Sequence, residues 1–182
     1  MTRISSLVSI LFVSSVLAQD PALRQEICVN AGWSHPLGTS LEYAADLGDG
    51  HVLGVGAGFS LAGGMFGLDA RRYFQTDRPA NPYLGVVVSK ATGLDGFLVV
   101  SEKETSDTAV YDIEGGLMVA PRLGLRISVA RLRLHFNGGY GFVLSGGGVT
   151  QVSGKDNAGT RKFLDMVSLG GPEFSASGGI AF

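Results

Sequence analysis

The stretch from Tyr111 to Ile127 alternates between two kinds of residue with a period of two. The odd positions carry apolar residues, glycine or proline: Tyr111, Ile113, Gly115, Leu117, Val119, Pro121, Leu123, Leu125 and Ile127. The even positions carry two acids, two arginines, a methionine and small residues: Asp112, Glu114, Gly116, Met118, Ala120, Arg122, Gly124 and Arg126. Successive side chains of a strand point to opposite faces, so this pattern predicts one strand with an apolar face and a polar face. Strands of soluble sheets usually have about 5–6 residues, and the greater length here favours a barrel with lipid outside and a polar interior.

The same alternation recurs along the chain and predicts eight strands. They are expected at about residues 25–34, 39–47, 51–60, 65–75, 82–90, 111–127, 132–144 and 171–182. Turn signals separate several of them, among which Gly48-Asp49-Gly50 is the strongest. An even number of strands is the rule for bacterial single-chain barrels. The predicted fold is therefore all-β, an eight-stranded antiparallel up-and-down transmembrane β-barrel.

Pro121 is the one residue that argues for a different count. A break at Pro121 would divide 109–130 into two strands and give ten in all. The alternation continues through Pro121 without a change of parity, which favours eight. Proline cannot donate a hydrogen bond to a neighbouring strand, so we expect a bulge or local unpairing there.

Two segments lose the alternation, and we expect both to be loops: residues 91–109 and 145–170. They fall at one end of the predicted barrel, and the short connections at 48–50, 76–81 and 129–131 fall at the other. Outer-membrane barrels have long extracellular loops and short periplasmic turns, so both long loops are predicted to face the cell exterior.

Outward aromatic residues form two groups that fit girdles at the membrane interfaces. The outer group is Trp33, Phe59, Phe66, Tyr111, Phe142 and Phe174, and the periplasmic group is Phe74 and Phe182.

The first 18 residues have the features of a secretory signal. Arg3 precedes an apolar run that ends at Val16-Leu17-Ala18, with small residues at the positions that signal peptidase reads. The run is shorter than the ~20 residues that a membrane-spanning helix needs. Residues 1–18 are therefore predicted to be cleaved, leaving 19–182 as the barrel.

Composition removes several classes of function. The net charge of −2 and the lack of a Lys/Arg-rich run predict no nucleic-acid partner. Glycine is frequent, 28 of 182 residues, and it lies within the strand patterns, where a narrow barrel needs small interior residues. Cys28 is the only cysteine, so no intramolecular disulfide is possible.

Charged residues of both signs fall on the predicted inward face. The acids are Glu26, Glu42, Asp46, Asp69, Asp112, Glu114 and Glu173, and the arginines are Arg71, Arg122, Arg126, Arg131 and Arg133. The interior of an eight-stranded barrel is just wide enough for side chains to fill, and charges there must be paired. We therefore predict a plugged, charge-paired lumen. The alternative is a narrow solute pore lined by arginines.

No pattern of catalytic, cofactor-binding or metal-binding residues is evident. His35, His51 and His135 fall on different elements without ligand spacing, so no metal and no cofactor are predicted. Some outer-membrane barrels of this size modify lipids through a histidine and a serine near the outer leaflet. His35 and Ser34 have that position, but no motif surrounds them, and we predict that the protein is not an enzyme.

The predicted mature chain resembles the small eight-stranded outer-membrane barrel superfamily, which includes the OmpA transmembrane domain and OmpX. The resemblance rests on the strand pattern, on the glycine-rich runs Gly67-Leu68-Asp69-Ala70-Arg71-Arg72-Tyr73-Phe74 and Asn137-Gly138-Gly139-Tyr140-Gly141-Phe142, and on the terminal Phe182. It implies a monomer in the outer membrane of a Gram-negative bacterium, surrounded by outer-membrane lipid. It also implies that the barrel-insertion machinery reads the final strand ending in Phe182.

The expected function is that of an integral outer-membrane protein with a structural or surface-contact role. The loops 91–109 and 145–170 would offer the surface for an extracellular partner. The alternatives are a lipid-modifying enzyme, a narrow pore, and a secreted soluble barrel that holds an apolar ligand. The last requires the apolar faces to point inward.

Overall fold

The computed structural model describes residues 25–75, 79–100, 108–154, 162, 164 and 169–182. The predicted signal segment, residues 1–18, lies outside these ranges. Within them, every helical stretch is too short or too polar to cross a bilayer.

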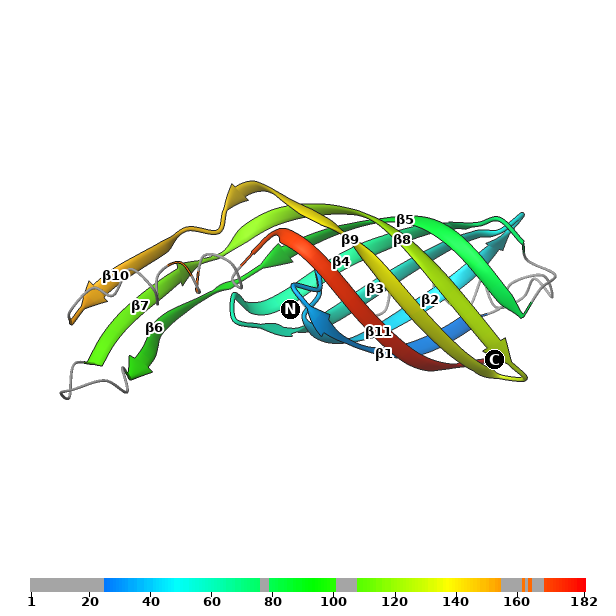
Figure 1. Cartoon of the computed structure of the whole chain (residues 1–182), viewed down its shortest axis with the longest axis horizontal. Helices are drawn as coiled ribbons and strands as arrows, with labels where there is room; N and C mark the ends of the chain where they lie inside the picture. The colour runs from blue at the N-terminus through cyan, green and yellow to red at the C-terminus, as the bar shows by residue number, and fades with distance from the viewer. Residues whose placement is uncertain (1–24, 76–78, 101–107, 155–161, 163, 165–168) are drawn as a thin grey trace, which may run out of the picture.

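Eight antiparallel strands close into a barrel (Figure 1). They are β1 (Gln25–Trp33), β2 (Thr39–Gly48), β3 (His51–Ser60), β4 (Gly63–Tyr73), β5 (Ala80–Ala91), β8 (Gly116–Val129), β9 (Leu132–Gly146) and β11 (Gly171–Ala181). Each barrel strand pairs with the barrel strands that precede and follow it along the chain, and β11 pairs with β1 to close the ring. The predicted eight-stranded antiparallel up-and-down barrel is therefore confirmed.

The predicted faces are also confirmed within the barrel. Leu41 and Leu68 point outward and are 58% and 56% exposed, whereas Glu42 and Asp69 point inward and are each 1% exposed. Five of the six aromatic residues predicted for the outer girdle are exposed on the outer surface: Trp33, Phe59, Phe66, Phe142 and Phe174. Phe74 and Phe182 are exposed near the opposite end.

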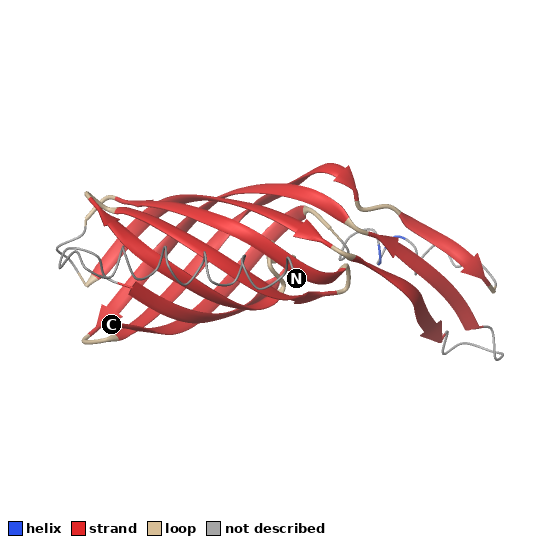
Figure 2. Ribbon diagram, turned by 180° about the vertical axis from the view of Figure 1, so that it is seen from behind, coloured by secondary structure: helices blue, strands red, loops and turns tan. Residues whose placement is uncertain are grey.

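Three shorter strands extend the barrel wall beyond one rim. These are β6 (Gly93–Val100), β7 (Thr108–Glu114) and β10 (Val149–Ser153). They pair in the order β10-β7-β6 and continue the neighbouring barrel strands β5, β8 and β9 on one side of the mouth (Figures 1 and 2). We call this three-stranded sheet the extension. The C-terminus lies at the other end of the barrel.

The extension corrects the prediction that 91–109 and 145–170 are loops over residues 93–100, 108–109 and 149–153. The parts of these two segments at 101–107, 155–161, 163 and 165–168 lie outside the described residues. Strands that are paired inside a barrel can stay paired beyond the rim, because each continues to satisfy the backbone of its neighbour. The sequence pattern conceals this continuation. Gly96 has φ +70°, and the register between β6 and β7 shifts between Leu94 and Phe97, so the alternation is interrupted. A second register shift, between Gln151 and Ser153, interrupts β10.

The predicted single strand from Tyr111 to Ile127 is divided at Gly115. Tyr111 and Ile113 are fully buried, so the expectation that Tyr111 points outward to lipid is wrong. Gly115 lies between β7 and β8 and reverses the parity, so odd positions face inward before it and outward after it. A Cβ at Gly115 would lie 2.6 Å from the Ala91 carbonyl oxygen, so only glycine fits this close approach. The apolar side chains on both sides of the break conceal the reversal.

Pro121 interrupts the pairing as predicted. The β8–β9 ladder runs through Val119 and Phe142 and resumes at Arg122 and Gly139 without a change of register. Ala120 and Pro121 fall in the gap between these pairs. The strand therefore continues through Pro121 with local unpairing on one side, while Val86 of β5 pairs with Pro121 on the other.

The interior of the molecule has an apolar layer near the extension. Residues from the barrel rim, from the inner face of the extension and from the segment before β11 form one cluster: Ala62, Met65, Ala91, Ala109, Tyr111, Ile113, Met118, Val149, Leu164 and Leu169. Farther into the barrel, Leu37 of the β1–β2 turn packs with Val87 and Ala120. The polar interior lies beyond this layer and is the candidate site.

Candidate functional site

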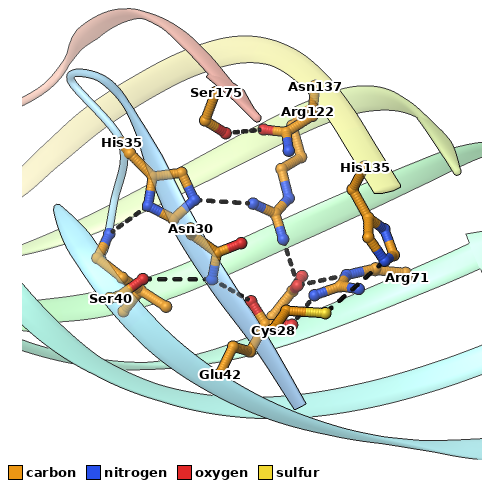
Figure 3. A network of polar contacts seen from close by, with 12 residues as sticks. Cys28, Asn30, His35, Ser40, Glu42, Arg71, Arg122, His135, Asn137 and Ser175 are labelled. Atoms are coloured by element: carbon orange, nitrogen blue, oxygen red, sulfur yellow. Dashed lines mark hydrogen bonds and ion pairs between the residues drawn. The ribbon is translucent and has the colours of Figure 1, made fainter. Parts of the chain in front are cut away.

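Arg71 of β4 lies at the centre of the polar interior and contacts three carboxylates. Its Nη1 is 2.9 Å from Glu26 Oε1 on β1, and its Nε is 2.5 Å from Asp69 Oδ2 on β4. Its Nη2 contacts Glu42 Oε1 on β2. All four side chains are nearly inaccessible to solvent. One guanidinium group thus joins three strands across the lumen (Figure 3).

Arg122 of β8 contacts the same cluster from the other side of β5. Its Nη2 donates to Asp69 Oδ2, the oxygen that Arg71 also contacts. Its Nη1 lies 3.4 Å from His35 Nε2 in the β1–β2 turn. Because β5 alone separates β4 from β8, the contact with Asp69 spans one strand, whereas the contact with His35 reaches the β1–β2 turn on the other side of the ring.

Interior glycines provide the space for these long side chains. A Cβ at Gly85 would lie 3.4 Å from the Arg122 side chain, and a Cβ at Gly139 would lie 2.6 Å from Glu173 Oε1. A Cβ at Gly54 would lie 3.0 Å from Glu42 Oε1. These glycines of the strands therefore make room for charged side chains inside the barrel.

Buried charges are tolerated only when they are paired, because removal from water costs several kcal/mol per ion. The contacts of Arg71 and Arg122 supply this pairing for three carboxylates. Glu173 is also fully buried, and among the described residues neither of its carboxylate oxygens has a hydrogen-bond partner. The polar interior therefore holds three carboxylates that are paired with arginine and one, that of Glu173, that has no hydrogen-bond partner among the described residues.

Glu26, Cys28 and His135 form a second group next to Arg71. Their ligand atoms lie within 4.8 Å of one another, and all three side chains are buried. His135 Nε2 is 3.6 Å from Glu26 Oε2 and 3.9 Å from Cys28 Sγ. Cys28 reaches toward His135 over Gly179, where a Cβ would collide with the sulfur.

Ser34 and His35, the candidates for lipid-modifying chemistry, have separate partners. The Ser34 hydroxyl donates to the Gly170 carbonyl oxygen at 3.0 Å. His35 Nδ1 is 3.1 Å from the Gly38 carbonyl oxygen, and Nε2 faces Arg122. A neutral ring that donates from Nδ1 and accepts at Nε2 satisfies both contacts. In this turn, burial and the Arg122 guanidinium hold the pKa of His35 well below its usual range, so the ring is neutral at pH 7.

The predicted set of inward charges is confirmed in part. Those that are buried in the lumen are Glu26, Glu42, Asp69, Arg71, Arg122, Arg133 and Glu173. Asp46 and Arg126 are half-buried. Three others lie elsewhere, and the expectation for them is wrong. Arg131 is exposed at the β8–β9 turn, and Asp112 and Glu114 lie on the extension, where Asp112 Oδ1 accepts from the Gly96 amide. Gly115 explains the two acids, because they precede the reversal of parity.

Sequence reasoning missed that His35 belongs to the interior network. His35 lies in a turn, and turns are normally solvated at the surface. Strand parity puts Cys28 and His135 on the inward faces of their strands, but it carries no information about which inward residues lie at the same height in the barrel. That information lies in the strand register, which pairs Cys28 with Gly179 and His135 with Ser177, both on β11.

No family model and no curated protein matches the sequence. Among solved structures, the chain is similar to the N-terminal β-barrel domain of Pseudomonas aeruginosa OprF, with 11% identity, a TM-score of 0.47, and coverage of 88% of this chain and 96% of that one. It is similar to Neisserial surface protein A, NspA, with 16% identity, a TM-score of 0.47 and the same two coverages. It is also similar to a major outer membrane protein from Thermus thermophilus, with 16% identity, a TM-score of 0.48, and coverage of 88% and 100%. The fold follows from the strand order of the chain itself, which is that of a closed eight-stranded antiparallel up-and-down β-barrel.

Proposed function

We propose that the protein is an integral outer-membrane barrel with a plugged, charge-paired lumen and a structural or surface-contact role. The observation that carries the proposal is the apolar outer surface of a closed barrel. Large apolar side chains are exposed on all eight barrel strands, among them Val29, Leu41, Val55, Leu68, Val88, Leu123, Phe136 and Ile180. Monomeric soluble proteins rarely expose contiguous apolar patches above a few hundred Å². A belt around a barrel without edges is what contact with lipid requires.

The arrangement of faces opposes a secreted soluble barrel with an apolar ligand inside. Such a barrel needs apolar side chains toward the lumen and polar ones toward water. Here the lumen holds Glu42, Asp69 and Arg71, while Leu41, Ala70 and Arg72 of the same strands face outward. Arg72 lies near the end of the barrel away from the extension, where it contacts His51. This position is expected for a long cation that reaches the membrane interface.

A plugged lumen is favoured over a narrow pore by the two layers inside the molecule. The guanidinium groups of Arg71 and Arg122 contact carboxylates from three strands and so cross the polar layer. The apolar cluster around Tyr111 and Met118 lies at the extension end of the lumen. A conducting pore would need a continuous hydrated path through both layers.

The extension is the proposed surface for contact with a partner outside the cell. In this orientation the short β2–β3 and β8–β9 turns and the C-terminus face the periplasm. The extension occupies the described strand residues of the two segments that were predicted to be long loops, and it gives the contact surface a defined backbone. Its two outer strands, β6 and β10, each pair on one side only in the described sheet, and such edges can add a strand from another chain.

Cell fractionation with surface proteolysis tests this proposal. The chain should enter the outer-membrane fraction, require detergent for extraction, and migrate differently on gels before and after heating. A protease site inserted between residues 155 and 161 should be cut in intact cells. The same site inserted at Asp49, in the β2–β3 turn, should be cut only after the outer membrane is permeabilised. Cleavage at Asp49 alone in intact cells would refute the orientation, and recovery as a detergent-free soluble protein would refute the membrane proposal.

A further inference from the structure

We infer that Glu26, Cys28 and His135 form a binding site for a borderline divalent metal ion such as Zn²⁺ inside the barrel. The three side chains offer a carboxylate oxygen, a sulfur and an imidazole nitrogen, all within 4.8 Å of one another. These are the donor types that bind zinc in proteins. The two β1 residues are separated by one position, so they share the inward face, and His135 approaches from β9 across β11.

The spacing of the ligand atoms suits a shared ion better than direct hydrogen bonds. The 3.6 Å between His135 Nε2 and Glu26 Oε2 exceeds the usual N–H···O range. A tetrahedral Zn²⁺ with Zn–N and Zn–O of about 2.0–2.1 Å and Zn–S of about 2.3 Å places its ligand atoms about 3.3–3.6 Å apart. The observed 3.6 Å and 3.9 Å are within a few tenths of an ångström of this geometry. A small inward shift of the side chains would complete it.

An independent observation comes from the His135 ring itself. The residue is 1% exposed, and among the described residues its Nδ1 has no hydrogen-bond partner. Its Nε2 has only two long contacts, 3.9 Å to Cys28 Sγ and 3.6 Å to Glu26 Oε2, in an environment where polar groups are normally well paired. A metal ion at Nε2 would replace these two long contacts with a coordinate bond.

The ligands themselves supply the charge that a divalent cation needs. Around them, Arg71 and Arg122 contact three carboxylates, those of Glu26, Glu42 and Asp69, and Arg126 is the cross-strand partner of His135. Three positive charges therefore face three negative ones before any metal binds. Metal binding would convert the Cys28 thiol to a thiolate, so Glu26 and Cys28 together would carry the two negative charges that balance a divalent ion.

Arg71 would act as a positioning residue for the Glu26 ligand. It contacts Oε1, which leaves Oε2 directed toward His135. Outer partners of this kind hold a ligand in place, and their loss typically weakens metal binding about 10–100-fold. Gly179 has a matching role for Cys28, because any larger residue there would displace the sulfur.

Cobalt binding to the full barrel in detergent micelles tests the site. Co²⁺ reports a thiolate ligand by a sulfur-to-metal charge-transfer band, and tetrahedral geometry by strong visible bands. The folded protein should show both, and Zn²⁺ should displace Co²⁺ and abolish them. Cys28→Ser should lose the charge-transfer band, and His135→Gln should bind at least about tenfold more weakly. His51→Gln, which alters an exposed rim histidine, should bind like the wild type.

Heat-modifiable gel migration shows that each variant is folded. If Cys28→Ser does not fold, thiol labelling of the wild-type protein can be used in place of the measurement on that variant. Under partly unfolding conditions, Zn²⁺ should then slow the reaction of Cys28 with a small maleimide by at least about tenfold. No charge-transfer band in the folded wild-type protein, or a band of equal strength in Cys28→Ser, would overturn the assignment. The assignment would also be overturned if the urea-unfolded chain bound Co²⁺ as tightly as the folded barrel does, because binding would then not depend on the fold.

Discussion

Replacing Arg71 with methionine should cost a large part of the stability of the barrel. Methionine keeps a long apolar stem, so the change mainly removes the guanidinium group. Glu26 and Glu42 then lose their contacts with Arg71, and Asp69 keeps only its contact with Arg122. Removing one partner of a buried pair typically costs about 3–5 kcal/mol, because the other charge stays buried without compensation. With several carboxylates affected, we expect a loss at or above the lower end of this range.

The free energy of unfolding can be measured by urea titration in detergent micelles or lipid vesicles. The folded fraction is read from heat-modifiable migration, and the values are extrapolated to zero urea. A loss of this size is large against the ~5–15 kcal/mol that holds typical domains folded. Glu42→Gln in the Arg71→Met background should recover part of the loss, since one uncompensated charge is removed.

The neighbouring Arg72 supplies a matched control. It is adjacent in the chain, points outward, and contacts only the exposed His51 among its described hydrogen-bond partners. Arg72→Met should change the free energy of unfolding by no more than about 0.5 kcal/mol, as is usual for exposed positions. A loss below about 1 kcal/mol for Arg71→Met, or equal losses for the two variants, would refute the idea that the lumen network holds the barrel together.

Three further changes probe the lipid face, the β1–β2 turn and the interior packing. Leu68→Arg, at the middle of β4 and 56% exposed, should lower stability in vesicles by about 2–4 kcal/mol, the usual cost of a cation facing lipid near the bilayer midplane; no loss would contradict lipid contact there. The pKa of His35 is lowered in the fold, so the unfolded chain binds more protons below about pH 6.5. The contribution of His35 to stability should therefore be lost as pH drops from about 7 to about 4.5, and urea titrations should show that His35→Asn lacks this contribution when it is compared with the wild type at each pH. Gly124→Ala should reduce the folded yield, since its Cβ would collide with the Tyr83 ring, whereas Gly178→Ala, whose Cβ has its nearest contact at 3.8 Å, should refold like the wild type.

The barrel could be predicted from the sequence because strand parity is a local property. Leu68 and Asp69 are adjacent in a strand, so their side chains must point to opposite faces of the sheet. This two-residue alternation does not depend on how the neighbouring strand pairs. The gap in pairing beside Pro121 was predictable for the same reason, since the missing amide hydrogen belongs to the residue itself.

The features that were missed depend on contacts between distant parts of the chain. Gly115 reverses the parity of its strand, but Ile113 and Leu117 are both apolar, and so the pattern looks unbroken. Burial of Tyr111 depends on the apolar cluster that the extension forms with the rim. The grouping of Cys28 with His135 depends on how far β1 and β9 are each shifted along β11, which no single-strand pattern records.

In the membrane setting that we propose, the position of Gly115 also determines the bilayer thickness that the barrel would match. Because the faces reverse there, the lipid-facing part of β8 begins at Leu117 and continues to about Ile127. At about 3.3 Å per residue this part is about 33 Å long, and at the usual tilt of about 40° it rises about 25 Å. That height equals the apolar band typical of outer-membrane barrels, which lie in thinner bilayers than most membrane proteins. Hydrophobic mismatch in thicker synthetic bilayers should therefore slow insertion, and short-chain lipids should favour it.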